Sequence, residues 1–182
     1  GTAFGTVLPS VSKDLGLPSG CAVATGAHDQ VCAAIGAGVL TEGSALDGIG
    51  SVDCITPAFR AIPDRAKMEE GNYALVPHAV DGLYATYAYF LTAGTLLRWY
   101  RDRFAGDLVR RAKEEGTSVY AMLDAAAPKE PTGLLVTPHF AGSGTPEMNP
   151  DARGAIAGLT LSTTAADIWR AILEGCAYEN LV

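Results

Sequence analysis

The second half of the chain shows the periodic pattern of amphipathic helices. Hydrophobic residues recur every three or four positions over about residues 92–104, 107–115 and 118–126. A further helix is predicted from Ala165, because Thr164 and Asp167 have the spacing of a capping box before an apolar run. The pattern therefore predicts a largely helical second half.

The first half shows shorter apolar runs that glycine, proline and aspartate interrupt. The pattern predicts a short helix over about 11–15, a strand over 21–25, a helix from Asp29, a β-hairpin over 44–56, and a loop over 57–70. A second hairpin is predicted where 73–80 and 83–89 flank Asp81-Gly82, and a buried strand over 134–138. Hairpins first and helices later, with a strand between them, indicate a mixed α/β protein.

Composition and charge indicate a folded protein that does not bind nucleic acid. The 182 residues are 48% hydrophobic and 18% charged. The net charge of −7 argues against a nucleic-acid partner, since no basic stripe is present to neutralise phosphates. Basic residues between Arg98 and Lys113 alternate with acidic ones and predict a solvated helix face. No apolar run reaches the length of a membrane span, so no membrane partner is expected.

The cysteines and the chain ends bear on location and completeness. Cys21, Cys32, Cys54 and Cys176 form no C-x-x-C pair, and three of them lie in apolar runs. This pattern favours buried, reduced thiols and a cytoplasmic location. The chain begins without methionine and stops within the predicted last helix, so we expect it to be a piece of a larger protein.

The most specific motif lies within residues 142–174. It runs Gly154-x-Ile156-x-Gly158-Leu159, then Asp167-Ile168 and Ala171-Ile172-Leu173-Glu174, with Asn149-Pro150-Asp151-Ala152-Arg153 upstream. A glycine-rich surface loop before an ordinary core helix is the alternative interpretation of this segment. The order of residues resembles the second characteristic motif of the FGGY family of carbohydrate kinases.

The resemblance covers nearly the whole chain and implies a fold. FGGY kinases have the ribonuclease H-like (actin-like ATPase) fold, an α/β fold of two lobes. The resemblance implies that residues 1–41 are the end of the first lobe and 42–182 the front of the second. Most of the first lobe and the end of the second would then lie outside this chain.

Asp29 is the candidate catalytic residue. Gly26-Ala-His28-Asp29-Gln30 follows an apolar strand and opens a helix, a place where glycine admits a ligand and the helix N-terminus attracts anions. The residues alone favour a helix cap at Asp29. The resemblance implies instead that Asp29 is the general base and that Gln30 contacts the polyol. His28 either touches substrate or simply ends the strand.

The resemblance also implies an ATP site. Gly50 and Ser51 match a glycine-containing turn that holds phosphates, for which a plain hairpin turn is the alternative. Gly94 and Arg98 match residues that line the nucleotide site, whereas Trp99 is predicted to pack in the core. Asp47 and Asp53 add negative charge near this turn, which must be turned away or paired with Mg²⁺.

The implied activity is ATP- and Mg²⁺-dependent phosphorylation of a small sugar or polyol, such as a pentulose. The alternative is an actin-like nucleotide-binding regulator or scaffold that phosphorylates no sugar. Because two lobes must close on the substrates, we expect the 182-residue chain alone to be inactive. Ser143-Gly144 replaces a Glu-Arg pair of many xylulose-kinase-like members, which argues against xylulose and leaves the identity of the sugar undetermined.

The remaining expectations concern two histidines, three charged loop residues and the oligomeric state. His78 and His139 each stand beside a proline, without a second ligand at metal-binding spacing, and we interpret both as loop or strand-end histidines. Glu147, Asp151 and Arg153 are predicted to hold their loop together. The sequence leaves open whether the protein forms a homodimer.

Overall fold

A computed structural model describes residues 2–181, which divide into two compact units. Unit 1 comprises the residues up to 46, then 56–62 and 75–86. Unit 2 comprises 47–55, 63–74 and the residues from 87 onward. The chain therefore passes between the units several times, and strand β4 (Asp53–Phe59) has residues in both.

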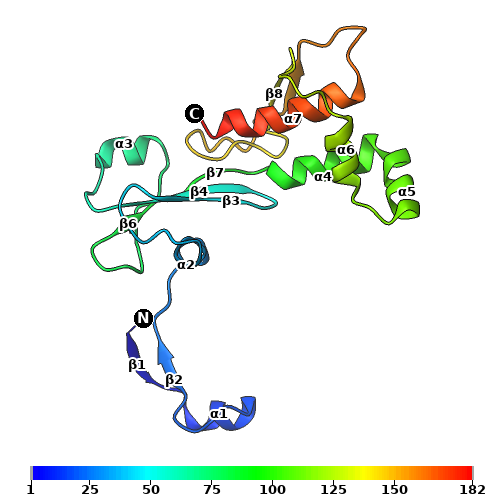
Figure 1. Ribbon diagram of the computed structural model, residues 1–182. Helices are drawn as coiled ribbons and strands as arrows, with labels where there is room; N and C mark the ends of the chain where they lie inside the picture. The colour runs from blue at the N-terminus through cyan, green and yellow to red at the C-terminus, as the bar shows by residue number, and fades with distance from the viewer. Residues whose placement is uncertain (1, 182) are drawn as a thin grey trace. The chain divides into compact units, whose positions relative to one another are not determined.

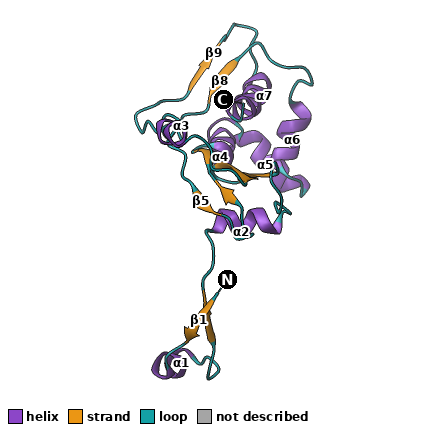
Figure 2. Cartoon of the chain, turned by 90° about the vertical axis from the view of Figure 1, so that its left-hand side faces the viewer, coloured by secondary structure: helices purple, strands orange, loops and turns teal. Residues whose placement is uncertain are grey.

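The described residues of unit 1 form short antiparallel strands and two short helices. β1 (Ala3–Thr6) pairs with β2 (Ala22–Ala24), and α1 (Pro9–Leu15) lies in the connection between them (Figures 1 and 2). After β2 the chain enters α2 (Asp29–Gly36). β6 (Tyr84–Ala85) pairs on one side with the end of β4 and on the other with β5 (Val76–Pro77). The small core of this unit consists of Ala34, Val39, Ala58 and Leu83.

Unit 2 holds the remaining helices and the larger core. In chain order its elements are the end of β3 (Ala45–Ile49), the start of β4, α3 (Arg65–Glu70), β7 (Ala88–Phe90), α4 (Ala93–Phe104), α5 (Gly106–Glu115), α6 (Val119–Ala126), β8 (Leu135–Thr137), β9 (Ala155–Ala157) and α7 (Ala165–Glu179). Residues 53–55 of β4 pair with β7, and β8 pairs with β9. α7 lies against β8 and α4 (Figure 1).

Trp169 of α7 is the centre of this core. Its side chain is 1% exposed and its ring contacts the rings of Tyr100 and Tyr120. Its indole Nε1 donates a hydrogen bond to Oδ1 of Asp124 at 2.9 Å, so the polar atom of a buried ring is satisfied. The amphipathic periodicity of α4, α6 and α7 is explained by this shared apolar centre.

The predicted capping box of α7 is confirmed. The Thr164 hydroxyl accepts a hydrogen bond from the backbone N–H of Asp167, whose carboxylate accepts one from the backbone N–H of Thr164. The Thr164 hydroxyl also donates to the Asp167 carboxylate, and this bond, with the one from the Thr164 N–H, lowers the pKa of Asp167. The helices predicted over 92–104, 107–115 and 118–126 are confirmed as α4, α5 and α6. α5 ends at Gly116, whose φ of 65° is the left-handed conformation that glycine adopts readily.

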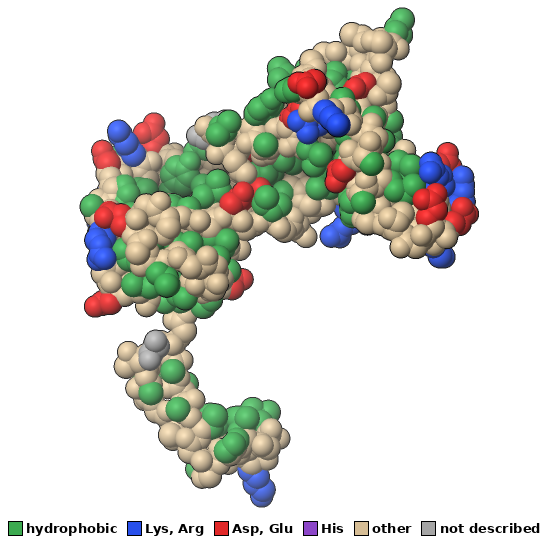
Figure 3. Space-filling view, viewed as in Figure 1, with side chains coloured by type: hydrophobic (Ala, Val, Ile, Leu, Met, Phe, Trp, Pro, Cys, Tyr) green, Lys and Arg blue, Asp and Glu red, His purple; other side chains and the backbone are tan. Residues whose placement is uncertain are grey.

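The predicted charged face is also confirmed. Arg110 pairs with Asp107 and Arg111 with Glu115 along α5, all with exposed side chains. Figure 3 shows basic and acidic side chains mixed on this helix. Exposed pairs of this kind contribute little to stability, so the face is a solvated one.

Glycines of the 142–174 motif, and Gly175 directly after it, permit close packing of backbones. A Cβ atom at Gly175 of α7 would lie 2.5 Å from the Val136 carbonyl oxygen of β8, and one at Gly144 would overlap the Tyr89 carbonyl oxygen. At Gly154 it would overlap the Phe140 ring. The glycine-rich segment is therefore not a free surface loop but a packed part of unit 2.

Polar groups hold the preceding loop in place. The Thr145 hydroxyl accepts from the Tyr89 backbone N–H at 2.8 Å, the Ser143 hydroxyl accepts from the Asn149 N–H, and the Asn72 amide donates to the Pro146 carbonyl. Of the residues expected to hold this loop together, Arg153 donates to two loop carbonyls. Glu147 instead lines a cavity.

Several elements differ from the sequence prediction. The predicted loop over 57–70 is wrong, because β4 continues to Phe59 and α3 forms where the Asp64 carboxylate caps the Ala66 N–H. β1 and β9 were not predicted, and the second hairpin strand is divided into β6 and β7. These are short strands of small or exposed residues, which carry almost no periodic signal. The strand at 134–138 is only partly buried, since Leu135 is 66% exposed.

The expectation of buried cysteines is wrong for most of them. Cys54 is buried, but Cys32 is exposed and the other two are intermediate. None of the four forms a disulfide. Within residues 2–181, no helix combines the length and the hydropathy that crossing a membrane requires.

We predict that Gly175→Ala destabilises the protein. The added methyl group would press on the Val136 backbone, and forced overpacking costs typically about 1–3 kcal/mol. Gly106→Ala is the matched control, because a Cβ there meets no atom within 4 Å and alanine favours a helix. Thermal unfolding followed by circular dichroism should show a lower Tm for Gly175→Ala alone; equal Tm values would contradict the packing argument.

Candidate functional site

A strand-to-helix corner in unit 1 presents the predicted catalytic aspartate. β2 ends at Ala24, and α2 begins at Asp29 with His28 as its N-cap residue. The backbone N–H of Gln30 is within hydrogen-bond distance of Asp29 Oδ1 at 2.8 Å and of His28 Nδ1 at 3.3 Å. The corner is thus fixed by local hydrogen bonds to the first turn of the helix.

The Asp29 side chain is 88% exposed. Its Oδ1 lies 2.9 Å from His28 Nδ1, and over residues 2–181 no lysine or arginine pairs with it. A carboxylate in this position remains able to accept a hydrogen bond from a ligand hydroxyl. The structure therefore brings His28, Asp29 and Gln30 together, as their adjacency in the sequence requires.

A groove lies beside this corner, within unit 1. Its lining residues come from both sides of the corner and from the loop after β5: Thr2, Thr25, Gly26, Ala27, His28, Cys32, Pro77, His78 and Ala79. Asp29 and Gln30 do not line it. His78 is a residue that sequence reasoning set aside, and nothing in its neighbourhood in the sequence signalled its place beside the corner.

The predicted phosphate turn and the predicted nucleotide-lining glycine lie together in unit 2. Gly50 and Ser51 form the tip between β3 and β4, and α4 begins directly against them. The Gly94 N–H donates to the Gly50 carbonyl at 2.9 Å, and the Thr95 N–H and hydroxyl donate to the Ser51 carbonyl. A Cβ at Gly94 would overlap the Gly50 carbonyl oxygen, so glycine is required for this approach.

The consequence is a turn whose carbonyls are already used by the helix. The first N–H groups of a helix lack partners within it, and here the turn supplies two acceptors. The Ser51 side chain stays exposed, as does Arg98 one helical turn after Gly94. Trp99 packs against the rings of Phe104 and Phe140, which confirms its predicted core position.

The two extra aspartates near this turn face each other. Asp53 is 2% exposed and accepts a hydrogen bond from the Asn180 amide through Oδ2, at 3.3 Å. Its Oδ1 has no hydrogen-bond partner among the described residues. Burial and the neighbouring Asp47 carboxyl raise the pKa of Asp53 to about 6. A raised pKa means that burial and the neighbouring Asp47 disfavour the negative charge of Asp53.

Cys176 lies beside the same pair. Burial, with Asp53 and Glu179 nearby, raises the pKa of its thiol to about 11. Such a thiol is protonated at neutral pH and is a poor nucleophile. Within residues 2–181, no three His, Cys, Asp or Glu side chains are arranged to hold a metal ion.

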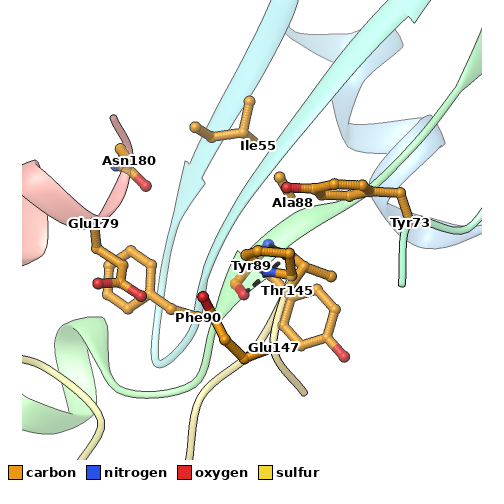
Figure 4. A pocket seen from close by; sticks show the side chains of 10 residues that line it. Ile55, Tyr73, Ala88, Tyr89, Phe90, Thr145, Glu147, Glu179 and Asn180 are labelled. Atoms are coloured by element: carbon orange, nitrogen blue, oxygen red, sulfur yellow. Dashed lines mark hydrogen bonds between the residues drawn. The ribbon is translucent and has the colours of Figure 1, made fainter. Parts of the chain in front are cut away.

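A cavity in unit 2 is lined by none of the predicted site residues. Figure 4 shows Glu147 beside Tyr89 and Thr145 at its wall, and Glu179 beside Phe90. Burial raises the pKa of Glu179, while His139, 3.5 Å away, has the opposite effect. His139 thus has a carboxylate partner, as expected of a structural histidine.

Known proteins resemble this chain over nearly its whole length. Residues 60–180 match the C-terminal domain of the FGGY family of carbohydrate kinases. Xylulose kinase of Staphylococcus epidermidis is 35% identical over 177 residues, which are 96% of this chain and 33% of that protein. Gluconokinase of Bacillus subtilis is 30% identical over 174 residues, which are 94% of this chain and 33% of that protein.

A solved structure agrees with these sequence matches. The crystal structure of xylulose kinase from Rhodospirillum rubrum superposes with a TM-score of 0.75 at 32% identity, over 96% of this chain and 33% of that one. The predicted actin-like ATPase fold, present in part, is thereby confirmed. The chain spans about a third of the length of the curated relatives that it matches.

We predict that Asp53→Asn stabilises the protein at neutral pH. A folded-state pKa raised from 3.8 to about 6 means that the folded state binds more protons than the unfolded state between these values. Stability is then lost as pH rises through about 6, and asparagine removes that loss. We expect Tm at pH 7.5 to rise by roughly 2–4 °C, the effect of about 1 kcal/mol in a protein of this size.

The measurement is thermal unfolding between pH 4 and 7.5. Asp151→Asn is the control, since that residue is an exposed loop aspartate of the same unit. A Tm for Asp53→Asn that stays at or below the wild-type value across this range would mean that the carboxyl pair is not destabilising when ionised.

Proposed function

The chain belongs to the FGGY family of carbohydrate kinases, and from this membership we propose that it contributes to an enzyme that phosphorylates a small sugar or polyol with ATP. The observation that carries the proposal is the exposed Asp29 at the strand-to-helix corner. We propose Asp29 as the general base and Gln30 as a substrate contact. In this assignment residues 1–41 are the end of one lobe and 42–182 the front of the other.

The chemistry needs a carboxylate that is close to the acceptor hydroxyl and not neutralised. The Asp29 carboxylate accepts the hydroxyl proton as the substrate oxygen attacks the γ-phosphorus of ATP. A bond from the substrate oxygen to phosphorus forms, the bond from phosphorus to the ADP oxygen breaks, and the proton resides on Asp29. Local hydrogen bonds to the Gln30 N–H orient the carboxylate before substrate binds.

The nucleotide part of the proposal rests on the turn at Gly50 and Ser51. At its exposed tip Ser51 offers a hydroxyl and a backbone N–H to phosphate oxygens, whereas the Gly50 N–H already donates to the Val52 carbonyl, and Gly94 fixes the turn to α4. Arg98, exposed on α4, is proposed as a further nucleotide contact. Mg²⁺ bound with ATP would neutralise developing charge on the phosphates, and magnesium sites commonly use few protein ligands beside phosphates.

The sugar itself is not assigned. The relatives described above are named for xylulose and gluconate, and the same family includes kinases of both. Ser143 and Gly144, which differ from many xylulose-kinase-like members, are buried in loop packing and give no direct contact to argue from. A cytoplasmic location and a homodimer stay predictions.

We predict that Asp29→Asn in the full-length protein lowers kcat for sugar phosphorylation by about 10²–10⁴-fold, because the proton acceptor is lost. ATP binding should persist, since the nucleotide residues lie elsewhere in the chain. The measurement is a coupled ADP-release assay over a panel containing xylulose, gluconate and glycerol, with ATP affinity from calorimetry.

Asp14→Asn is the control for this experiment, because Asp14 is an exposed aspartate of the same unit. An Asp29→Asn variant as active as wild type would refute the assignment of Asp29 as the general base. If nucleotide binds but no sugar in the panel is phosphorylated by the wild type, the result favours a nucleotide-binding regulator.

We predict that Gly94→Ala raises the KM for ATP by about tenfold or more while the KM for the sugar changes little. The added methyl group would displace the Gly50 carbonyl and with it the proposed phosphate turn. Gly106→Ala, which adds a methyl group in open space on α5, should leave both constants unchanged. Equal effects of Gly94→Ala on both substrates would contradict a role specific to the nucleotide.

A further inference from the structure

His78 is a buried histidine with one satisfied and one unsatisfied ring nitrogen. It follows β5 directly and is 7% exposed. Its Nδ1 accepts a hydrogen bond from the backbone N–H of Val80 at 3.0 Å. Since Nδ1 accepts, the proton of the neutral ring is assigned to Nε2.

The Nε2–H of His78 is therefore a donor in need of an acceptor. Among the described residues, Nε2 has no hydrogen-bond partner although the atom is buried. A buried donor without a partner costs free energy, and such groups call for an explanation. His78 lines the adjacent groove, so a ligand there that displaced the atoms covering Nε2 would supply an oxygen acceptor and remove this cost.

The groove beside His78 is the one at the catalytic corner. His78 shares its lining with Thr25, Gly26 and His28, the residues that lead into Asp29. A hydroxyl and ring nitrogens are thus available there, but none of the described lining residues is a lysine or arginine. This composition suits neutral hydroxyl groups better than a phosphate or a carboxylate.

We propose that the His78 Nε2–H donates a hydrogen bond to a substrate hydroxyl other than the one that is phosphorylated, which makes His78 a specificity-determining residue. The inference rests on the proposed sugar or polyol kinase function. It adds a contact from the loop after β5 to those expected from Asp29 and Gln30. The hydrogen bond from the Val80 N–H to Nδ1 holds the ring in the loop and leaves Nε2 as a donor without a partner among the described residues.

The central variant is His78→Asn in the full-length protein. The asparagine Oδ1 takes the place of Nδ1 and keeps the acceptor for the Val80 N–H, but the side chain is too short to replace Nε2. We expect the KM for the sugar to rise about tenfold, the usual effect of one lost neutral hydrogen bond. The KM for ATP and the Tm should stay close to wild type.

Two further measurements separate binding from folding. His78→Gln places an amide near the position of Nε2 and should restore part of the sugar affinity. For deoxy analogues of the substrate found in the panel, His78→Asn should lose its effect on KM with the analogue that lacks the bonded hydroxyl. His139→Asn is the matched control, since His139 also has one buried ring nitrogen without a partner among the described residues, but in unit 2.

Three outcomes would overturn the inference. The first is a folded His78→Asn variant with an unchanged sugar KM. The second is a rise in both KM values with a lower Tm that His78→Gln does not reverse, which indicates a structural role. The third is a wild type that phosphorylates no sugar, in which case the proposed function fails as well. If Asp29→Asn loses activity while His78→Asn keeps wild-type kinetics, the proposal for His78 is refuted and the proposed kinase function stands.

Discussion

Close approach of one backbone to another, permitted by glycine, is the constraint on which unit 2 depends. Gly94 brings the first turn of α4 onto the Gly50 carbonyl, and Gly175 brings α7 onto β8. Gly144 does the same for the loop against β7. A side chain at any of these positions would push the packed elements apart. The motif glycines thus have a packing reason that is independent of any ligand.

Asp29 and Asp53 lie in different environments, which suit them to different roles. Asp29 is exposed and held by a local N–H group, so its carboxylate is available to a ligand. Asp53 is buried, and burial together with the neighbouring Asp47 carboxyl raises its pKa. Both stand near elements of the proposed site. Only Asp29 has the accessible, oriented carboxylate that proton transfer from a hydroxyl requires.

The sequence predicted the elements that a local pattern determines, but not the features that depend on packing between distant residues. The capping box at Thr164 and Asp167 and the periodicity of α4 predicted helices correctly, because both are written in a few neighbouring residues. α3 escaped prediction because its six residues show no apolar face and rely on Asp64 as a cap. The role of His78 escaped for another reason: a loop contact to Val80 and a groove with distant residues leave no trace in spacing.

Each part of the proposed site is organised within its own unit. The Gln30 N–H holds Asp29 in unit 1, and the bonds from Gly94 and Thr95 hold the Gly50–Ser51 turn in unit 2. In each set, donor and acceptor belong to the same unit. A proton acceptor and a phosphate turn can therefore each be ready before both substrates are bound. In the proposed kinase, binding energy would then be used to position the substrates rather than to build the catalytic groups.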